Sequence, residues 1–456
     1  MNPHHRSFRR TSALILTGSI AALLSWPGPT TLHAAGLLAS DGATGDLFGV
    51  SSSISGSIGL VGAVYDDIGA NTDQGSAYVF RSLNTATGTL TQNVKLTASD
   101  GAANDQFGIS ASQSGSIGLV GAWRDDIGFV DQGSAYVFRS LDTATGTITQ
   151  NVKLTASDGA GSDWFGSSVG LDGDQFVIGA YGKNSSTGKA YSGSIASVTT
   201  LDAGSTSKTI SQISFVSQDD WIIGQTTDSN SVKLSAGDSA NVTAAGKVVS
   251  IGQNAGSDNN TLVINGTLTA NAVNVGTAGN TGNVLSGTGT IQNGTGFVSI
   301  NGALVVGDTT LGSPVASLLT IGGTGSTIMG AGSQVKFDLF TGAGLGDSTA
   351  IAAAADRLKL FGALDFTLGG TLVLGNPTGM SGFAAGDQWL LADLSGGGSI
   401  TGAFTLDYTA LGLGGGLTGS LNNATGVFSI AAVPEPSRAL LLMLGLMGVV
   451  GRRRRR

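Results

Sequence analysis

This chain of 456 residues contains no cysteine, three histidines and one glutamate, Glu435. Without cysteine it has neither a disulfide framework nor a thiol nucleophile, so its folded regions depend on sheets and core packing. All three histidines, His4, His5 and His33, lie near the N-terminus, which leaves the rest of the chain without an imidazole base or a histidine-ligated zinc site. We therefore predict that the protein is not an enzyme. Polysaccharide cleavage by a pair of aspartates is the catalytic alternative, although no isolated pair stands out.

Charged residues are also scarce, at 11% of the chain, and they are unevenly distributed. Between the two terminal segments the chain holds 29 Asp against 13 Lys and Arg, a net charge of −16. This acidity argues against nucleic acid as a partner and is compatible with divalent cations or a hydrated matrix. The hydrophobic content of 41% argues against wholesale disorder.

Glycine is abundant instead, with 74 residues against 7 prolines. Stretches rich in Thr, Val, Ile and Ser alternate with Gly, Asn and Asp turns, whereas residues that favour helices are few. This composition predicts an all-β fold built from many short strands.

The N-terminus has the three parts of an export signal within residues 1–35. A basic segment, "MNPHHRSFRR", precedes the apolar segment "SALILTGSIAALL", and small residues then allow cleavage after Ala34 or Ala35. An ordinary first transmembrane helix is the alternative, which the short apolar segment and the following prolines disfavour. Arg9 and Arg10 leave the choice between general and twin-arginine export open.

Residues 36–195 contain an internal repeat. Phe48, Phe107 and Phe165 are 59 and 58 residues apart, and "RSLNTATGTLTQNVKLTASDGA" shares 20 of 22 residues with its next copy. Each of about three units is predicted to form four strands, "FGVSSSIS", "SIGLVGAVY", "QGSAYVFRS" and "LTQNVKLTA" in the first. That make-up is typical of one propeller blade.

The Phe-Gly pairs, each followed by "LVGA" or "VIGA", resemble the FG-GAP repeats of integrin-type β-propellers. The resemblance implies a propeller-blade fold and a surface or adhesive function. A closed propeller needs about four to eight blades. Three units therefore leave three alternatives: an open stack, blades borrowed by association, or continuation into diverged sequence.

Calcium is the cofactor that the resemblance suggests. In that family an acidic loop between the two motifs holds the ion, but the corresponding stretches of the first two units, "SISGSIGL" and "SQSGSIGL", contain no carboxylate. A second acidic loop repeats in both units and could hold Ca²⁺ weakly, because carboxylates suit this hard cation. Solvated turn residues are the interpretation we favour, since Asp is a preferred turn former. The loop residues are Asp66, Asp67, Asp73, Asp125, Asp126 and Asp131.

Residues 196–432 have a different sequence pattern. "NTLVINGTLTANAVNVG" and its continuation alternate Leu, Val and Ile with small polar residues, separated by Gly and Asn. This pattern predicts a parallel β-helix or a similar solenoid, in which each short strand stacks its apolar side chains on the next rung. The stretch resembles the passengers of autotransporters, and low-complexity disorder is the alternative.

The C-terminal segment, residues 433–456, resembles a PEP-CTERM sorting signal, with its motif at 433–437 centred on Pro434, Glu435 and Pro436. An apolar run over 439–451 would be about 20 Å long as a helix, short of a bilayer core of about 30 Å. The resemblance implies transient anchoring in the inner membrane and cleavage by an exosortase, and an ordinary tail anchor is the alternative. The apolar run and the arginines that would stay cytoplasmic are Ala439, Leu440, Leu441, Leu442, Met443, Leu444, Gly445, Leu446, Met447, Gly448, Val449, Val450, Gly451, Arg452, Arg453, Arg454, Arg455 and Arg456.

Taken together, these segments predict an exported surface or extracellular-matrix protein of structural or adhesive type. Its expected partners are an exosortase, exopolysaccharide or other surface proteins, and the inner membrane through the tail. A calcium-dependent adhesin that binds a carbohydrate or another ligand is the first alternative.

Overall fold

The computed structural model of the chain describes residues 35–201, 206–277, 282–307, 316–339, 355–377, 380–381, 383–414 and 416–433. The predicted signal peptide up to Ala34 and the predicted sorting tail from Pro434 lie outside the described residues. Within the described ranges strands dominate, and no helix there is long and apolar enough to cross a membrane. The all-β prediction is confirmed for these ranges. The helical turns are α1 (Lys183–Ser186), η1 (Ile195–Val198) and η2 (Thr409–Leu411).

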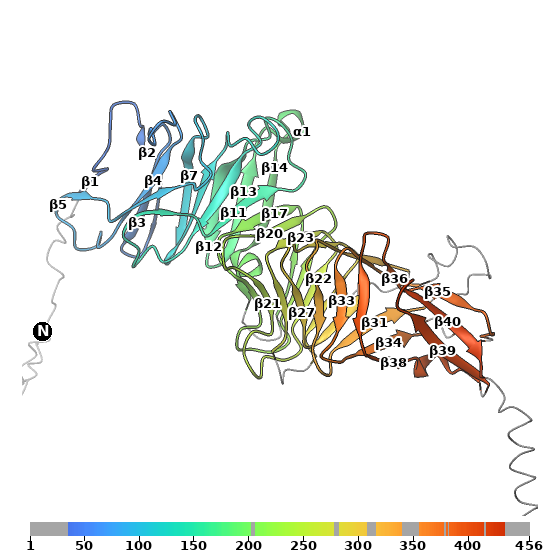
Figure 1. Ribbon diagram of the computed structural model, residues 1–456. Helices are drawn as coiled ribbons and strands as arrows, with labels where there is room; N and C mark the ends of the chain where they lie inside the picture. Colours follow the sequence, from blue (N-terminus) through green and yellow to red (C-terminus); the bar gives the residue numbers. More distant parts are fainter. Residues whose placement is uncertain are drawn as a thin grey trace, which may run out of the picture.

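The repeat units form three sheets that follow one another in a row (Figure 1), and consecutive strands within each unit pair antiparallel. Tight turns at Gly56, Gly115 and Gly173, all with positive φ, connect the first two strands of each unit. The first unit contains β2 (Phe48–Ser55), β3 (Ile58–Ala63), β4 (Ser76–Phe80) and β6 (Val94–Thr97). The second contains β7 (Phe107–Ser114), β8 (Ile117–Ala122), β9 (Ser134–Phe138) and β11 (Val152–Ala156). The third contains β12 (Phe165–Asp172), β13 (Gln175–Ala180) and β14 (Lys189–Ser194).

The prediction of four strands in each unit was wrong for the third unit, whose sheet contains only β12, β13 and β14. In the first two units the fourth strand was wrong in one respect, because "LTQNVKLTA" or its copy is divided between two sheets. Its first half lies in β5 (Gly88–Thr91), which pairs in parallel with β1 (Ala35–Leu38), whereas its second half forms β6. In the next unit β10 (Gly146–Thr149) likewise pairs in parallel with β6 of the first unit. A strand from the second unit thus completes the sheet of the first.

Close backbone contact between units explains why the Phe-Gly and Gly-Ala motifs repeat. A Cβ on Gly62 would lie 2.0 Å from the carbonyl oxygen of Gly108, and one on Gly121 would lie 1.9 Å from that of Gly166. The Ser110 hydroxyl also donates to the Gly166 carbonyl at 2.7 Å. Glycine is required at these positions because the strands of neighbouring units approach too closely for a side chain.

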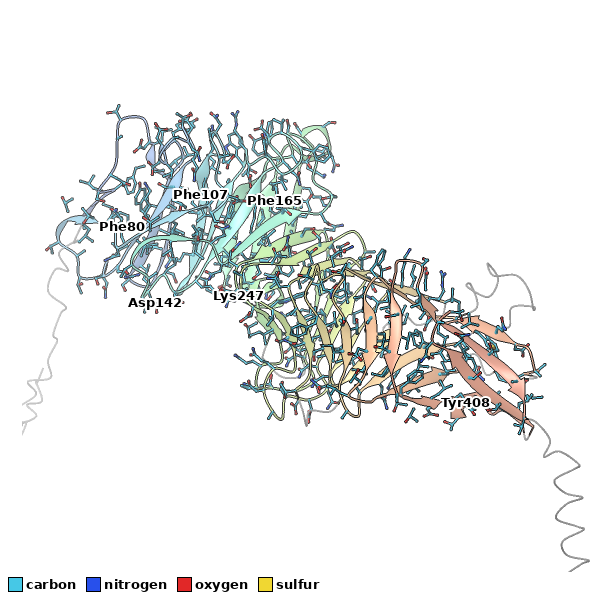
Figure 2. The ribbon with its side chains drawn as sticks, viewed as in Figure 1. Phe80, Phe107, Asp142, Phe165, Lys247 and Tyr408 are labelled. Carbon is cyan, nitrogen blue, oxygen red and sulfur yellow. The ribbon has the colours of Figure 1, made fainter. Side chains whose placement is uncertain are left out.

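The units form an open stack within this chain. Figure 2 shows Phe107 and Phe165, equivalent residues of the second and third units, in succession along the row. In the second unit, β17 (Ile213–Ser217) pairs antiparallel with β11, on the edge that β10 occupies on β6 in the first unit. Of the three alternatives, the described chain therefore shows an open stack that continues into the following sequence.

A parallel β-solenoid follows the repeats (Figure 1), which confirms the prediction for this region. Its strands stack into three sheets. The first contains β17, β20 (Ser239–Val242), β23 (Thr267–Ala270), β26 (Thr290–Gln292), β29 (Leu318–Gly322), β32 (Arg357–Leu360) and β36 (Ala392–Asp393). The second contains β15 (Thr200–Leu201), β18 (Trp221–Ile223), β21 (Val249–Ile251), β24 (Val273–Val275), β27 (Val298–Ile300), β30 (Thr327–Met329), β33 (Ala363–Phe366) and β37 (Ser399–Gly402). The third contains β16 (Ser207–Ile210), β19 (Ser231–Leu234), β22 (Thr261–Ile264), β25 (Val284–Gly287), β28 (Ala303–Val306), β31 (Gln334–Asp338), β34 (Thr371–Gly375) and β38 (Thr405–Asp407).

Side chains at equal register form continuous ladders inside the solenoid. Leu262, Leu285 and Leu304 lie opposite one another on β22, β25 and β28, and all three are fully buried. At the corner before these strands, Asn260 accepts a hydrogen bond from the Asn230 amide and donates one to Asn283. Such ladders explain the regular spacing of Leu, Val and Ile in the sequence. Each rung of the solenoid must place an apolar side chain against the apolar side chain of the neighbouring rung.

An antiparallel sheet covers the end of the solenoid, formed by β35 (Gln388–Leu390), β40 (Val427–Ala432) and β39 (Leu417–Asn422). Trp389 and Phe428 from this sheet are buried and belong to the same hydrophobic core as Leu119 of the second repeat. The cap therefore shields the last parallel rung, whose unpaired edge would otherwise invite association. The core runs without a break from the repeats to the cap.

Candidate functional site

The loops at one edge of the three repeat sheets gather into a continuous surface, here named the loop edge, at which α1 lies in Figure 1. It consists of residues 39–47, 64–75, 98–106, 123–133, 157–164 and 181–188. Backbone hydrogen bonds join its loops within a unit, as from Tyr65 to Asp46, and between units, as from Trp164 to Asp131. All six aspartates predicted as calcium ligands lie on this edge.

Asp66 and Asp125 are buried in ion pairs, so the interpretation of these two as solvated turn residues was wrong. The Lys95 ammonium lies 2.7 Å from Asp66 and 2.6 Å from Asp41. The Tyr78 hydroxyl is 2.8 Å from the same Asp66 oxygen, and Ser76 also donates to it. Because a buried carboxylate requires a compensating charge and hydrogen bonds, this cluster is fully paired.

The second unit repeats this cluster with Lys153 between Asp125 and Asp100, at 2.6 Å from each. Burial alone would lower the pKa of Lys153, but the two carboxylates hold that pKa above its usual value. Burial also raises the pKa of Tyr136, whose hydroxyl donates to Asp125. Lys153 is therefore a charged, fixed part of the sheet edge.

The remaining four predicted aspartates shape turns. Asp67 accepts a hydrogen bond from the backbone of Asp73 at 2.9 Å, and Asp126 does so from Asp131 at 2.7 Å. Asp67 and Asp126 are exposed, as the turn interpretation expects. No group of three or more His, Cys, Asp or Glu in the described ranges is placed to hold a metal ion. In the structure Asp66 and Asp125 thus form ion pairs with lysines, and the six predicted aspartates do not come together as the ligands of one metal ion.

The third unit inverts part of the charge pattern. Lys183 occupies the position of Asp66 and Asp125, and its ammonium lies 2.8 Å from Asp163. Lys189, in place of the serine of the other units, lies 2.8 Å from Asp158. The exchange keeps charges paired although two residue types change. The sequence analysis missed the lysine partners of these aspartates. For Lys95 and Lys153 the signal was their recurrence beside aspartates in "KLTASDG", whereas Lys183 and Lys189 lie in "GKNSSTGK", which has no such copy.

Asp105, beside the second cluster, has an unusual proton affinity. Burial raises the pKa of Asp105 to about 7, and the charges of Asp125 and Asp100 act in the same direction. The backbone amide of Ala102 donates to it at 2.6 Å and opposes the shift. This carboxyl consequently changes its charge near neutral pH.

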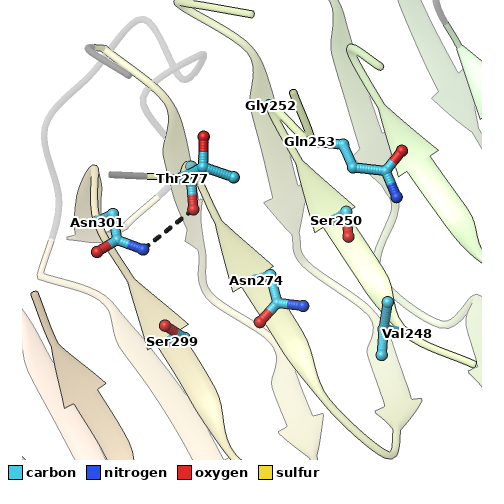
Figure 3. Close-up of a pocket in the computed structure, with 9 residues that line it drawn as sticks. Val248, Ser250, Gly252, Gln253, Asn274, Thr277, Ser299 and Asn301 are labelled. Atoms are coloured by element: carbon cyan, nitrogen blue, oxygen red, sulfur yellow. Dashed lines mark hydrogen bonds between the residues drawn. The ribbon is translucent and has the colours of Figure 1, made fainter. Parts of the chain in front are cut away.

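A polar groove crosses the outer face of the solenoid (Figure 3) and has a volume of about 430 Å³. Hydroxyl and amide side chains form its floor, and the Asn301 amide is held by the Gly276 carbonyl at 3.1 Å. It contains no charged side chain, so it offers hydrogen bonds but no acid, base or metal ligand. The lining residues are Val248, Ser250, Gly252, Gln253, Asn274, Gly276, Thr277, Ser299 and Asn301.

Three segments of the chain match the FG-GAP repeat. They cover residues 33–80, 90–138 and 148–195. The second and third matches each include the fourth strand of one unit, β6 or β11, and the first three strands of the next unit, so the family's repeat frame joins two neighbouring sheets. A comparison with curated proteins gave no match. The FG-GAP resemblance predicted from the Phe-Gly pairs is therefore confirmed at all three positions.

Proposed function

We propose that this chain is a non-catalytic surface or extracellular-matrix protein of structural and adhesive type. In it, the solenoid is a stalk that holds the FG-GAP repeats away from the surface of a bacterial cell. One observation carries the proposal: a single hydrophobic core runs from the second repeat to the C-terminal cap. Repeats that each pack on their neighbours extend the chain in one direction, which suits a stalk.

Dimensions and surface chemistry support this role. Eight stacked strands at about 4.8 Å per rung give the solenoid a length of roughly 35 Å. Its groove is neutral and lined with hydroxyls and amides, which suits hydrated carbohydrate better than an ionic ligand. No His, Cys or Glu occurs among the described residues, which accords with a binding function.

Export and sorting complete the proposal, although both terminal segments lie outside the described residues. The signal peptide would direct the chain across the inner membrane, where the apolar run would hold it transiently. An exosortase would then cut near Pro434, Glu435 and Pro436 and release or transfer the body to the cell surface or matrix.

The test combines mass and location of the native protein. Intact mass spectrometry of the protein from surface fractions is expected to show a chain that has lost residues at both ends. In cells without the sorting protease, the full tail is expected to persist in the membrane fraction. A mature surface protein that still ends at Arg456 would contradict sorting. Absence of the protein from the surface and matrix fractions would contradict the structural and adhesive function.

A further inference from the structure

Three aromatic rings form a platform on the loop edge where the second and third repeats meet. Trp123 and Tyr181 follow the Gly-Ala motif of β8 and β13, and Trp164 precedes the Phe-Gly motif of β12. The ring centroids lie 5.8 Å apart for Trp123 and Trp164, and 4.7 Å apart for Trp164 and Tyr181. Trp123 and Tyr181 are separated by 5.9 Å, so the three rings form one closed cluster. We name this cluster the aromatic platform.

The platform is exposed in a way that the fold does not require. Tyr181 is 49% exposed, and on the adjoining loop Phe129 and Val130 are 59% and 66% exposed. In the first unit, the equivalent positions hold Val64 and Leu47, and that unit folds in the same way. Large apolar side chains gathered on a surface indicate an interaction site when packing does not demand them.

Polar groups hold and border the rings. The Trp123 indole donates to the Gln106 side chain at 2.6 Å, which fixes the ring orientation. The Arg124 guanidinium lies 5.4 Å from the Trp123 ring centre. Among the described residues, Arg124 Nε and Trp164 Nε1 are buried and have no hydrogen-bond partner. Leaving such donors unpaired costs about 1 to 3 kcal/mol each, so the arrangement is not optimised for stability alone.

From this geometry we infer that the aromatic platform binds neutral polysaccharide through stacking of pyranose rings. The C–H face of a pyranose packs against an aromatic ring, and its hydroxyls take hydrogen bonds from flanking polar groups. Arg124 borders the Trp123 ring and provides donors, and the exposed carboxylate of Asp126, on the same loop as Trp123, provides acceptors. A neutral glycan is favoured over an anionic one because the chain between its terminal segments carries a net charge of −16.

A protein partner suits the platform less well. A stable protein interface buries about 800 Å² on each partner. Three half-covered rings and two loop residues provide only part of that area, and the loop of Trp123 also carries Asp126 and Asp131. The inference rests on the adhesive function proposed above, since it names the ligand class for that function.

Affinity electrophoresis of the purified full chain tests this inference, with dextran, hydroxyethylcellulose, galactomannan and alginate in separate gels. At least one neutral polymer is expected to retard the wild type, and Tyr181→Ala is expected to weaken that retardation by about tenfold. Tyr65→Ala is the matched control, since Tyr65 is also an exposed tyrosine of the loop edge but lies outside the platform. It is expected to bind like the wild type. Urea midpoints of both variants establish that they are folded.

Several results would overturn the inference: no retardation by any neutral polymer, equal retardation of Tyr181→Ala, or retardation by alginate alone. Binding to isolated matrix separates this inference from the general function. If the wild type and Tyr181→Ala both bind matrix equally, adhesion stands and the platform assignment fails. Matrix binding that is lost after protease treatment of the matrix, yet survives periodate oxidation, would assign the platform to a protein partner instead.

Discussion

Replacing Gly121 by alanine tests the packing on which the repeat stack depends. The added Cβ would lie 1.9 Å from the Gly166 carbonyl oxygen, against about 3.0 Å for the closest tolerated contacts. The third unit would have to move by about 1.1 Å, and the atom in the way is backbone rather than a flexible side chain. Overpacking of this kind costs about 1 to 3 kcal/mol, and loss of the Ser110 hydrogen bond adds about 1 kcal/mol.

We therefore expect Gly121→Ala to lower the free energy of unfolding by about 2 to 4 kcal/mol. If the repeats unfold as one unit, the melting temperature should fall by roughly 5 to 15 °C. Urea denaturation followed by tryptophan fluorescence measures the change, because Trp123 and Trp164 lie at this boundary. Repeat arrays can unfold in segments, so the transition of these two residues is separated from that of Trp221 and Trp389 by repeating the measurement with Trp221 and Trp389 replaced by phenylalanine in both proteins.

Gly170→Ala is the matched control on the facing unit. Gly170 lies on β12, has no positive φ, and a Cβ there would meet nothing within 4 Å. This substitution should leave the urea midpoint unchanged or raise it slightly, since alanine loses less chain entropy on folding. Equal midpoints for Gly121→Ala and Gly170→Ala would refute the claim that the units pack through these glycines.

The remaining predictions concern buried polar groups and calcium. Lys153→Met should destabilise the protein by about 3 to 5 kcal/mol, because it leaves Asp125 buried without its cation. The free energy of unfolding of Asp105→Asn, relative to wild type, should rise between about pH 4 and 7, since the wild-type carboxyl has a folded pKa of about 7 and binds its proton less tightly when unfolded. Asn260→Ala should cost about 1 to 3 kcal/mol, because the buried backbone N–H of Asn230 loses its acceptor, whereas Asn283 still accepts from the backbone N–H of residue 260. Millimolar Ca²⁺ should give no saturable heat in titration calorimetry, because Lys95 already neutralises Asp66.

Urea midpoints measured against pH check the first three of these predictions. Lys247→Met is the control for Lys153, since its ammonium lies 3.8 Å from Asp219 at the surface, and a loss below about 1 kcal/mol is expected. Parallel stability curves for wild type and Asp105→Asn across pH 4 to 8 would show that Asp105 does not titrate near neutrality. Asn274→Ala, on the outer groove, is the control for the asparagine ladder. A saturable calcium heat that Asp66→Asn abolishes would contradict the ion-pair assignment.

Regular spacing made most of the architecture predictable. Recurrence of Phe48, Phe107 and Phe165 predicted the repeat units, and the alternation around Leu262 predicted stacked parallel strands. These features depend on contacts between equivalent positions, which a periodic sequence displays directly. The division of "LTQNVKLTA" between two sheets was not predictable in this way, because both halves have the same β-rich composition.

The candidate site was harder to predict than the fold. Asp66, Asp67 and Asp73 look alike in the sequence, yet Asp66 is buried against Lys95 while Asp67 remains exposed. Lys95 lies 29 positions further along the chain, on β6 of the same unit. An ion pair between residues so far apart in the sequence depends on the order of the strands in the sheet, and a count of charged residues does not reveal that order.

By itself, the sequence determined the all-β class, the FG-GAP repeats and the parallel solenoid, because each arises from a local period in apolar and glycine positions. Only the tertiary structure decided that the units form an open stack, that Asp66 and Asp125 are ion-paired, and that Trp123, Trp164 and Tyr181 meet. These three outcomes depend on how neighbouring units approach one another. Gly121 and Gly166 set that approach by allowing backbone to touch backbone, and the same contact brings the platform's loops together.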